Sequence, residues 1–120
     1  MKNKISSEIK KIIEENPLAL ATVDKKGKPY VIAVAFAKVE NNKIIITNNY
    51  MKRTINNLQY CLKISLVGWD RKWEGYNFQG KAKYFDKGEW LGFVKSLKEN
   101  KKEPCRGAIV IEINEIKKCG

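Results

Sequence analysis

Apolar and polar residues alternate with a period of two over much of the chain. In the range 75–85, Tyr76, Phe78 and Ala82 face one way, and Gln79 faces the other. Such alternation is typical of a half-buried β-strand. We predict six strands, over residues 18–23, 30–39, 43–47, 62–69, 75–85 and 107–116. Short turns between the first three predict that these strands form an antiparallel meander.

Three other segments follow the period of a helix. The first covers residues 7–15, with Ile12 and Ile13 on its apolar face and Ser6 or Ser7 as its cap. We predict the other two helices from about residue 52 to residue 60, and from residue 86 or 87 to residue 97.

The order of these elements bounds the fold class. A parallel sheet needs a long crossover for every parallel pair of strands, and helices alternate with the predicted strands only twice. We therefore predict a mainly β protein of the α+β type: a six-stranded, mostly antiparallel barrel with three short peripheral helices. The 120 residues contain no repeat and no linker, so we expect one domain over residues 1–120.

The residue types that are missing exclude several kinds of chemistry. The chain has no histidine and three cysteines, none of them in a C-x-x-C pair. This composition excludes Ser-His-Asp and Cys-His catalysis, and it predicts neither a metal site nor a catalytic side chain. No apolar run approaches the roughly 20 residues that span a bilayer, and no secretion signal is found at the start. We therefore expect a cytoplasmic protein with reduced thiols and no membrane partner.

The charge balance points to an anionic partner or to a solvated surface. The chain holds 24 Lys and Arg residues against 13 Asp and Glu residues, a net charge of +11. A lysine-rich surface explains this excess, and so does a nucleic acid or a phosphate-bearing cofactor. Only three residues are arginine, which is few for readout of nucleic acid. Trp69 and Trp73 beside Arg71 and Lys72 leave single-stranded nucleic acid as an alternative, which we do not favour.

The range 44–54 combines an apolar strand, a polar turn and a helix start that carries two cations. Lys52 and Arg53 stand where the helix dipole is positive, and Thr54 follows them. Cations at that end are explained by a bound anion such as a phosphate. In the alternative interpretation the two cations point into water and Thr54 caps the helix.

Five segments, in this order along the chain, carry a resemblance to a known family: residues 20–23, 27–31, 47–58, 75–82 and 106–111. In this set the chain resembles the FMN-binding split-barrel family, which includes pyridoxamine 5′-phosphate oxidase and small bacterial FMN-binding proteins. The resemblance covers about residues 10–120. It implies that the predicted barrel is a split barrel.

The resemblance implies a set of cofactor-binding residues. It places the FMN phosphate where the third strand gives way to the helix, at Lys52, Arg53 and Thr54, with Asn48 and Asn49 nearby. It places the ring system along the second and third strands, near Val34, Ala35, Phe36, Ile46 and Thr47.

The resemblance also implies a homodimer with each flavin at the subunit interface. The segment before the last strand, Pro104, Cys105 and Arg106, then reaches the flavin of the neighbouring subunit.

The function implied is that of a small FMN-binding redox flavoprotein, either an electron-transfer protein or a flavin-dependent oxidoreductase. Its redox partner is a small molecule or a protein. Pyridoxamine 5′-phosphate oxidase activity itself is not expected, because the chain is much shorter than those enzymes. A deazaflavin is the alternative cofactor within the same fold, and haem is disfavoured because histidine is absent.

Overall fold

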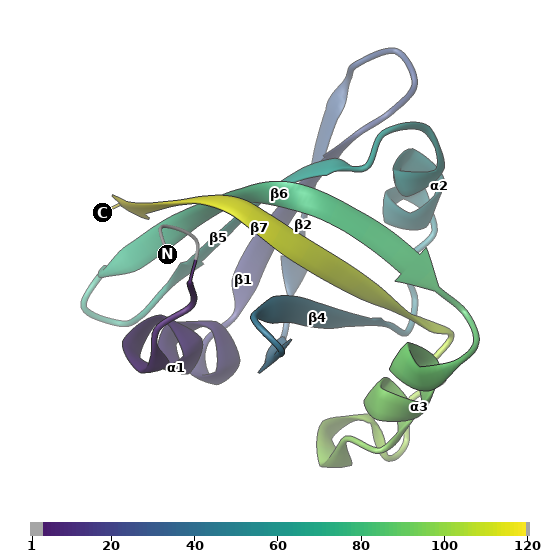
Figure 1. Cartoon of the computed structure of the whole chain (residues 1–120). Coiled ribbons are helices and arrows are strands. Elements are labelled where there is room, and N and C mark those ends of the chain that lie inside the picture. The colour runs from purple at the N-terminus through teal and green to yellow at the C-terminus, as the bar shows by residue number, and fades with distance from the viewer. Residues whose placement is uncertain (1–3, 120) are drawn as a thin grey trace.

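The computed structural model describes residues 4–119 as a strongly curved antiparallel sheet with helices at its periphery (Figure 1). In these residues seven strands pair in the order β2-β1-β5-β6-β7-β4-β3. The helices are α1 (Ser7–Glu15), α2 (Arg53–Tyr60), α3 (Glu89–Lys95) and a 3-10 turn, η1 (Lys98–Asn100). The strands are β1 (Leu18–Val23), β2 (Pro29–Val34), β3 (Lys38–Glu40), β4 (Lys43–Asn48), β5 (Lys63–Trp69), β6 (Gly75–Phe85) and β7 (Gly107–Cys119). The predicted fold class, a mainly β split barrel with three helices, is confirmed.

The strand count differs from the prediction because the range 30–39 is two strands. β2 ends at Val34 and pairs with β1, whereas β3 begins at Lys38 and pairs with β4. These pairs lie at opposite ends of the strand order, so the three predicted strands form no meander and the sheet stays open. The break was invisible in the sequence because apolar residues continue through it to Ala37, which is fully buried.

The helices pack against the sheet at two hydrophobic clusters. The hydroxyl of Ser6 accepts the backbone N–H of Ile9 and caps α1, as predicted, and Ile13 of α1 is fully buried in the main core. α3 covers a second, smaller cluster around Val94 and Ala108. None of the helices within residues 4–119 is long and apolar enough to cross a bilayer.

The turn between β4 and α2 is shaped by one buried asparagine. The Oδ1 of Asn48 accepts the backbone N–H of Met51 at 2.8 Å, and its Nδ2 donates to the hydroxyl of Tyr84 on β6 at 2.9 Å. The backbone N–H of Arg106 donates to the Asn48 carbonyl oxygen at 2.8 Å. Asn48 thus ties the start of α2 to β6 and to the segment before β7.

Candidate functional site

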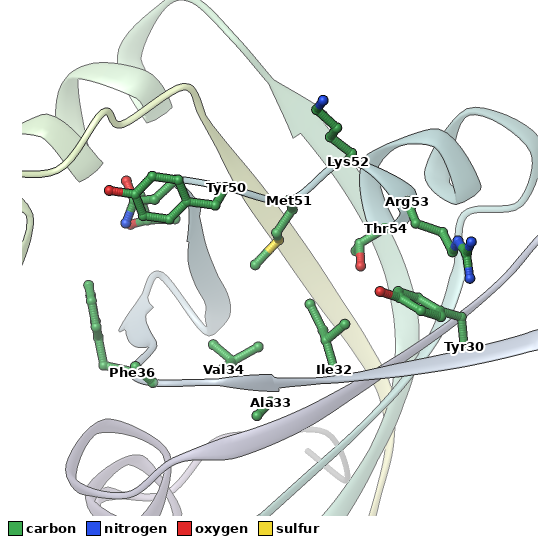
Figure 2. Close-up of a pocket in the computed structure, with 13 residues that line it drawn as sticks. Tyr30, Ile32, Ala33, Val34, Phe36, Tyr50, Met51, Lys52, Arg53 and Thr54 are labelled. Atoms are coloured by element: carbon green, nitrogen blue, oxygen red, sulfur yellow. The ribbon is translucent and has the colours of Figure 1, made fainter.

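A cavity of about 350 Å³ lies between β2 and the turn from β4 to α2. Its volume is in the usual range for small-molecule sites. Figure 2 shows β2 as one wall, with Met51 and Thr54 on the opposite side. The lining residues are Tyr30, Ile32, Ala33, Val34, Ala35, Phe36, Thr47, Asn49, Tyr50, Met51, Lys52, Arg53 and Thr54.

One end of the cavity is cationic and polar. The Arg53 guanidinium lies 5.0 Å from the centre of the Tyr30 ring, a cation–π distance. Thr54 is buried beside it, while Lys52 is exposed and extends away from β2 (Figure 2). Neither Lys52, the N-cap, nor any other side chain of the described residues caps α2, and the first turn of this helix holds no acidic residue. Lys52 and Arg53 are both exposed, as the alternative interpretation expects, but Thr54 does not cap the helix. The positive end of the helix dipole is therefore open to an anion.

The middle of the cavity is an apolar wall. Ile32 and Val34 point from β2 toward Met51, whereas Ala33 points to the other side of the strand (Figure 2). Val34 is buried at 5% exposure. Because alternate residues of a strand face opposite sides, Ile32 and Val34 form this wall together.

The far end carries two aromatic rings, and one of them belongs to a tyrosine with a raised pKa. Phe36 and Tyr50 lie at the end opposite to Arg53 (Figure 2). The hydroxyl of Tyr50 donates to the carboxylate of Glu103 at 2.9 Å. This hydrogen bond to a carboxylate raises the pKa of Tyr50 above its ordinary value of 10.0. Through Glu103, the segment before β7 therefore contacts Tyr50, a residue that lines the cavity.

Behind this end lies a network of buried amides. Asn100, at 2% exposure, donates through Nδ2 to Thr47 Oγ1 and to the Val94 carbonyl oxygen, both at 2.8 Å. Its Oδ1 accepts from Nδ2 of Asn49 at 3.5 Å, and Oδ1 of Asn49 accepts the Cys105 backbone N–H at 2.9 Å. The network joins the 3-10 turn, β4 and the segment before β7.

The structure brings most of the predicted site residues to one cavity. These are Val34, Ala35, Phe36, Thr47, Asn49, Lys52, Arg53 and Thr54. The cavity is not lined by Ile46, which packs in the barrel core, or by Asn48, which is held by Tyr84 and Met51. The segment Pro104, Cys105 and Arg106 lies beside the end of β4, where the Arg106 backbone N–H donates to the Asn48 carbonyl oxygen. Cys105 is buried and Arg106 is exposed. A contact of these five residues with a ligand stays a prediction.

The sequence prediction left out five lining residues, Tyr30, Ile32, Ala33, Tyr50 and Met51. A signal for two of them was present: the period of two places Tyr30 and Ile32 on the same face as the predicted Val34 and Phe36. Asn100 gave no signal, because a lone asparagine in a basic loop is indistinguishable from a surface residue.

Comparison with known proteins agrees with this geometry. The family model described as pyridoxamine 5′-phosphate oxidase matches residues 5–120. An uncharacterized protein of Methanocaldococcus jannaschii is 33% identical over 94% of this chain and 79% of its own length.

Solved structures show the same fold. HupZ of Group A Streptococcus is 24% identical, with a TM-score of 0.87 over 95% of this chain and 93% of its own. An FMN-binding protein of Syntrophomonas wolfei is 16% identical, with a TM-score of 0.73 over 99% of this chain and 84% of its own. HutZ, the heme storage protein of Vibrio cholerae, is 15% identical, with a TM-score of 0.72 over 95% of this chain and 94% of its own.

The open antiparallel sheet and its three short helices define a protein of the split-barrel fold. The chain belongs to the pyridoxamine 5′-phosphate oxidase family.

Proposed function

We propose that this chain is a small FMN-binding redox flavoprotein that works as a homodimer. The observation that carries the proposal is the polarity of a single cavity. One end offers Arg53, Thr54 and the uncapped start of α2, and the rest offers a flat apolar wall that ends in Phe36 and Tyr50. An FMN molecule has the matching polarity, an anionic phosphate at one end and a flat ring system at the other.

The residues at the cationic end fit a phosphate. Arg53 supplies a guanidinium and Thr54 a buried hydroxyl. Backbone N–H groups at the start of α2 add donors that have no side-chain acceptor within the described residues. Charge-assisted hydrogen bonds to such a phosphate are worth about 1.5–3 kcal/mol each.

The ring end fits an uncharged aromatic system. Val34, Ala35 and Phe36 contribute small or flat apolar surfaces, and Thr47 and Asn49 contribute the polar atoms. A bound FMN would supply one- and two-electron redox chemistry. The role of the protein is then to hold the ring, to exclude water from it, and to set its electrostatic environment. Its redox partner is a small molecule or a protein.

The outer face of β2 supports the proposed dimer. Val31 is 63% exposed, and Ala33 on the same face of β2 is exposed as well. Val31 pairs with Ala21 of β1, so the surface continues into the sheet as small apolar side chains. A flat apolar face beside an open cavity suits a second copy of the chain, which would complete the flavin site from outside.

Other cofactors of the same fold are alternatives. Solved structures of similar fold include an F420 reductase, with a TM-score of 0.71 over 88% of this chain at 17% identity, and the heme storage protein described above. A deazaflavin shares the flat ring and the anionic tail of FMN, so it is the second candidate. Haem ranks behind both because the chain has no histidine to ligate iron.

The visible spectrum of the purified protein tests the proposal. We expect flavin absorption bands, FMN in the extract after denaturation, and a dimer by sedimentation at micromolar concentration. A protein that is colourless and also fails to bind added FMN would refute the flavin assignment. A strict monomer with full FMN affinity would refute the interface.

A further inference from the structure

The hydrogen bond between Asn100 and Thr47 has a direction that the structure fixes. The Nδ2 atom of Asn100 lies 2.8 Å from the carbonyl oxygen of Val94, and a carbonyl oxygen only accepts. This end of the Asn100 amide is therefore the donor. The same Nδ2 lies 2.8 Å from Oγ1 of Thr47, so the threonine oxygen is the acceptor there.

The other end of the Asn100 amide is fixed in the same way. Oδ1 of Asn49 accepts the backbone N–H of Cys105, which only donates, at 2.9 Å. Nδ2 of Asn49 is then the end that points to Oδ1 of Asn100, at 3.5 Å. Backbone groups at both ends of the network thus prevent either amide from turning over.

The direction of this bond leaves the Thr47 proton for the cavity. A threonine hydroxyl carries one proton, and Asn100 already donates to its oxygen. Within residues 4–119 no side chain or backbone group is found to accept the Thr47 proton, and Thr47, at 8% exposure, lines the cavity. Among the described residues, a hydroxyl so placed is a donor without an acceptor, and a ligand in the cavity can supply one.

We propose that Asn100 is a positioning residue that holds Thr47 as a hydrogen-bond donor directed into the cavity. The cavity then selects a ring that presents an acceptor atom, a carbonyl oxygen or an imino nitrogen, next to Thr47. Flavins and deazaflavins carry such acceptors on their pyrimidine ring, and a plain hydrocarbon ring does not. The inference rests on the proposed flavin function, and it adds to that function the residues that recognise the ring.

Riboflavin is the probe, because it carries the ring without the phosphate and so reports on this end of the cavity alone. Thr47→Val removes the donor while keeping the shape, and Asn100→Ala lets the hydroxyl turn away. We expect each variant to weaken riboflavin binding roughly 3- to 10-fold, the ratio for one neutral hydrogen bond. We expect the double variant to bind no more weakly than Thr47→Val, since Asn100 acts through Thr47. Thr47→Ser, which keeps the hydroxyl, should bind like the parent.

A matched pair elsewhere in the chain controls for structural damage. Nδ2 of Asn57 donates to Oγ1 of Thr22 at 2.9 Å, and both residues are buried outside this cavity. Asn57→Ala and Thr22→Val should lower the melting temperature but leave riboflavin affinity within about twofold of the parent. Unchanged affinity in Thr47→Val, or additive losses in the double variant, would overturn the proposal.

An unfolding cycle on the ligand-free protein separates this inference from the proposed function. If Asn100 holds Thr47, the destabilisations by Thr47→Val and Asn100→Ala are non-additive without any ligand. Strictly additive values would overturn the inference whatever binds. A parent protein that binds neither FMN nor riboflavin but shows the coupling would refute the flavin function while supporting the oriented donor.

Discussion

The guanidinium of Arg53 lies 5.0 Å from the centre of the Tyr30 ring, so the first residue of α2 is held over the first part of β2. Both residues line the cavity. The contact fixes a flexible cation at the end where the helix dipole is also positive. None of the three ion pairs found among the residues 4–119 involves Arg53.

Arg53→Ala should weaken FMN binding much more than riboflavin binding. A lost charge-assisted contact of about 1.5–3 kcal/mol corresponds to roughly a 10- to 150-fold rise in Kd. Riboflavin lacks the phosphate and should bind nearly as it does to the parent. Fluorescence titration with both flavins measures the two constants, and Lys95→Ala on α3 is the control for a loss of charge alone. Equal losses for both flavins would place the phosphate elsewhere.

Glu103→Gln should lower the pKa of Tyr50 toward 10.0, because the hydrogen bond from Tyr50 to the Glu103 carboxylate raises it. A raised pKa means that the folded protein holds this proton more tightly than the unfolded chain. The bond therefore stabilises the fold below the ordinary pKa, and this stabilisation is lost as the pH rises through the pKa of the folded state.

An ultraviolet titration of phenolate absorbance checks this value, with Tyr50→Phe subtracted to isolate one of the five tyrosines. An unchanged titration in Glu103→Gln would show that the two side chains do not meet in solution.

Because of the ion pair between Lys38 and Glu99, the free energy of unfolding should depend on pH in the acid range. The Lys38 ammonium lies 2.6 Å from the Glu99 carboxylate, and this hydrogen bond lowers the pKa of Glu99 below its ordinary value of 4.5. The stabilisation is present above the ordinary pKa and is lost as the pH falls through the pKa of the folded state.

In the Glu99→Gln variant, the free energy of unfolding should therefore fall less steeply as the pH is lowered. Adding Lys38→Met to this variant should not change that slope further. Urea unfolding at pH values from neutral to acid measures this slope. The ion pair would be contradicted if the free energy of unfolding of Glu99→Gln fell with pH as steeply as that of the parent.

Gly80→Ala should destabilise the barrel by about 1–3 kcal/mol, the usual cost of overpacking. Gly80 follows the bulge where the register of β6 on β7 shifts, and an added Cβ would clash with the backbone carbonyl of Glu112. Gly92→Ala is the control, because its Cβ would meet nothing within 4 Å on helix α3. In urea unfolding, we expect the free energy of unfolding of this control to equal that of the parent or to exceed it by up to about 1 kcal/mol. A Gly80→Ala variant as stable as Gly92→Ala would contradict the tight bulge.

Much of the fold was predictable because local patterns decide it. The range of α1 was predicted without error, since Ser6 marks its start and Asn16 its end, and the alternation over β6 is regular. The separation of β2 from β3 was not predictable, because it depends on which strands they pair with across the sheet. α3 begins at Glu89, later than the predicted residue 86 or 87, because Gly88 before it has a φ of +84° that is not helical.

The candidate site, like the fold, contains residues that the sequence could predict and residues that it could not. Lys52 and Arg53 were predictable because their charge conflicts with a helix start, which is a local fact. Asn100 was not, because its role comes from contacts with Thr47 and Val94 that only the folded chain creates. Nor could the sequence show that Asn48 turns away from the cavity to bind Tyr84.

Titration of the ligand-free parent protein with FMN and with riboflavin, followed by flavin fluorescence, tests the central claim most directly. If Arg53, Thr54 and the start of α2 hold a flavin phosphate, FMN binds at least about tenfold more tightly than riboflavin, and the difference shrinks as salt is added. Equal affinity for the two flavins would contradict the phosphate site, and no binding of either would contradict the flavin function itself.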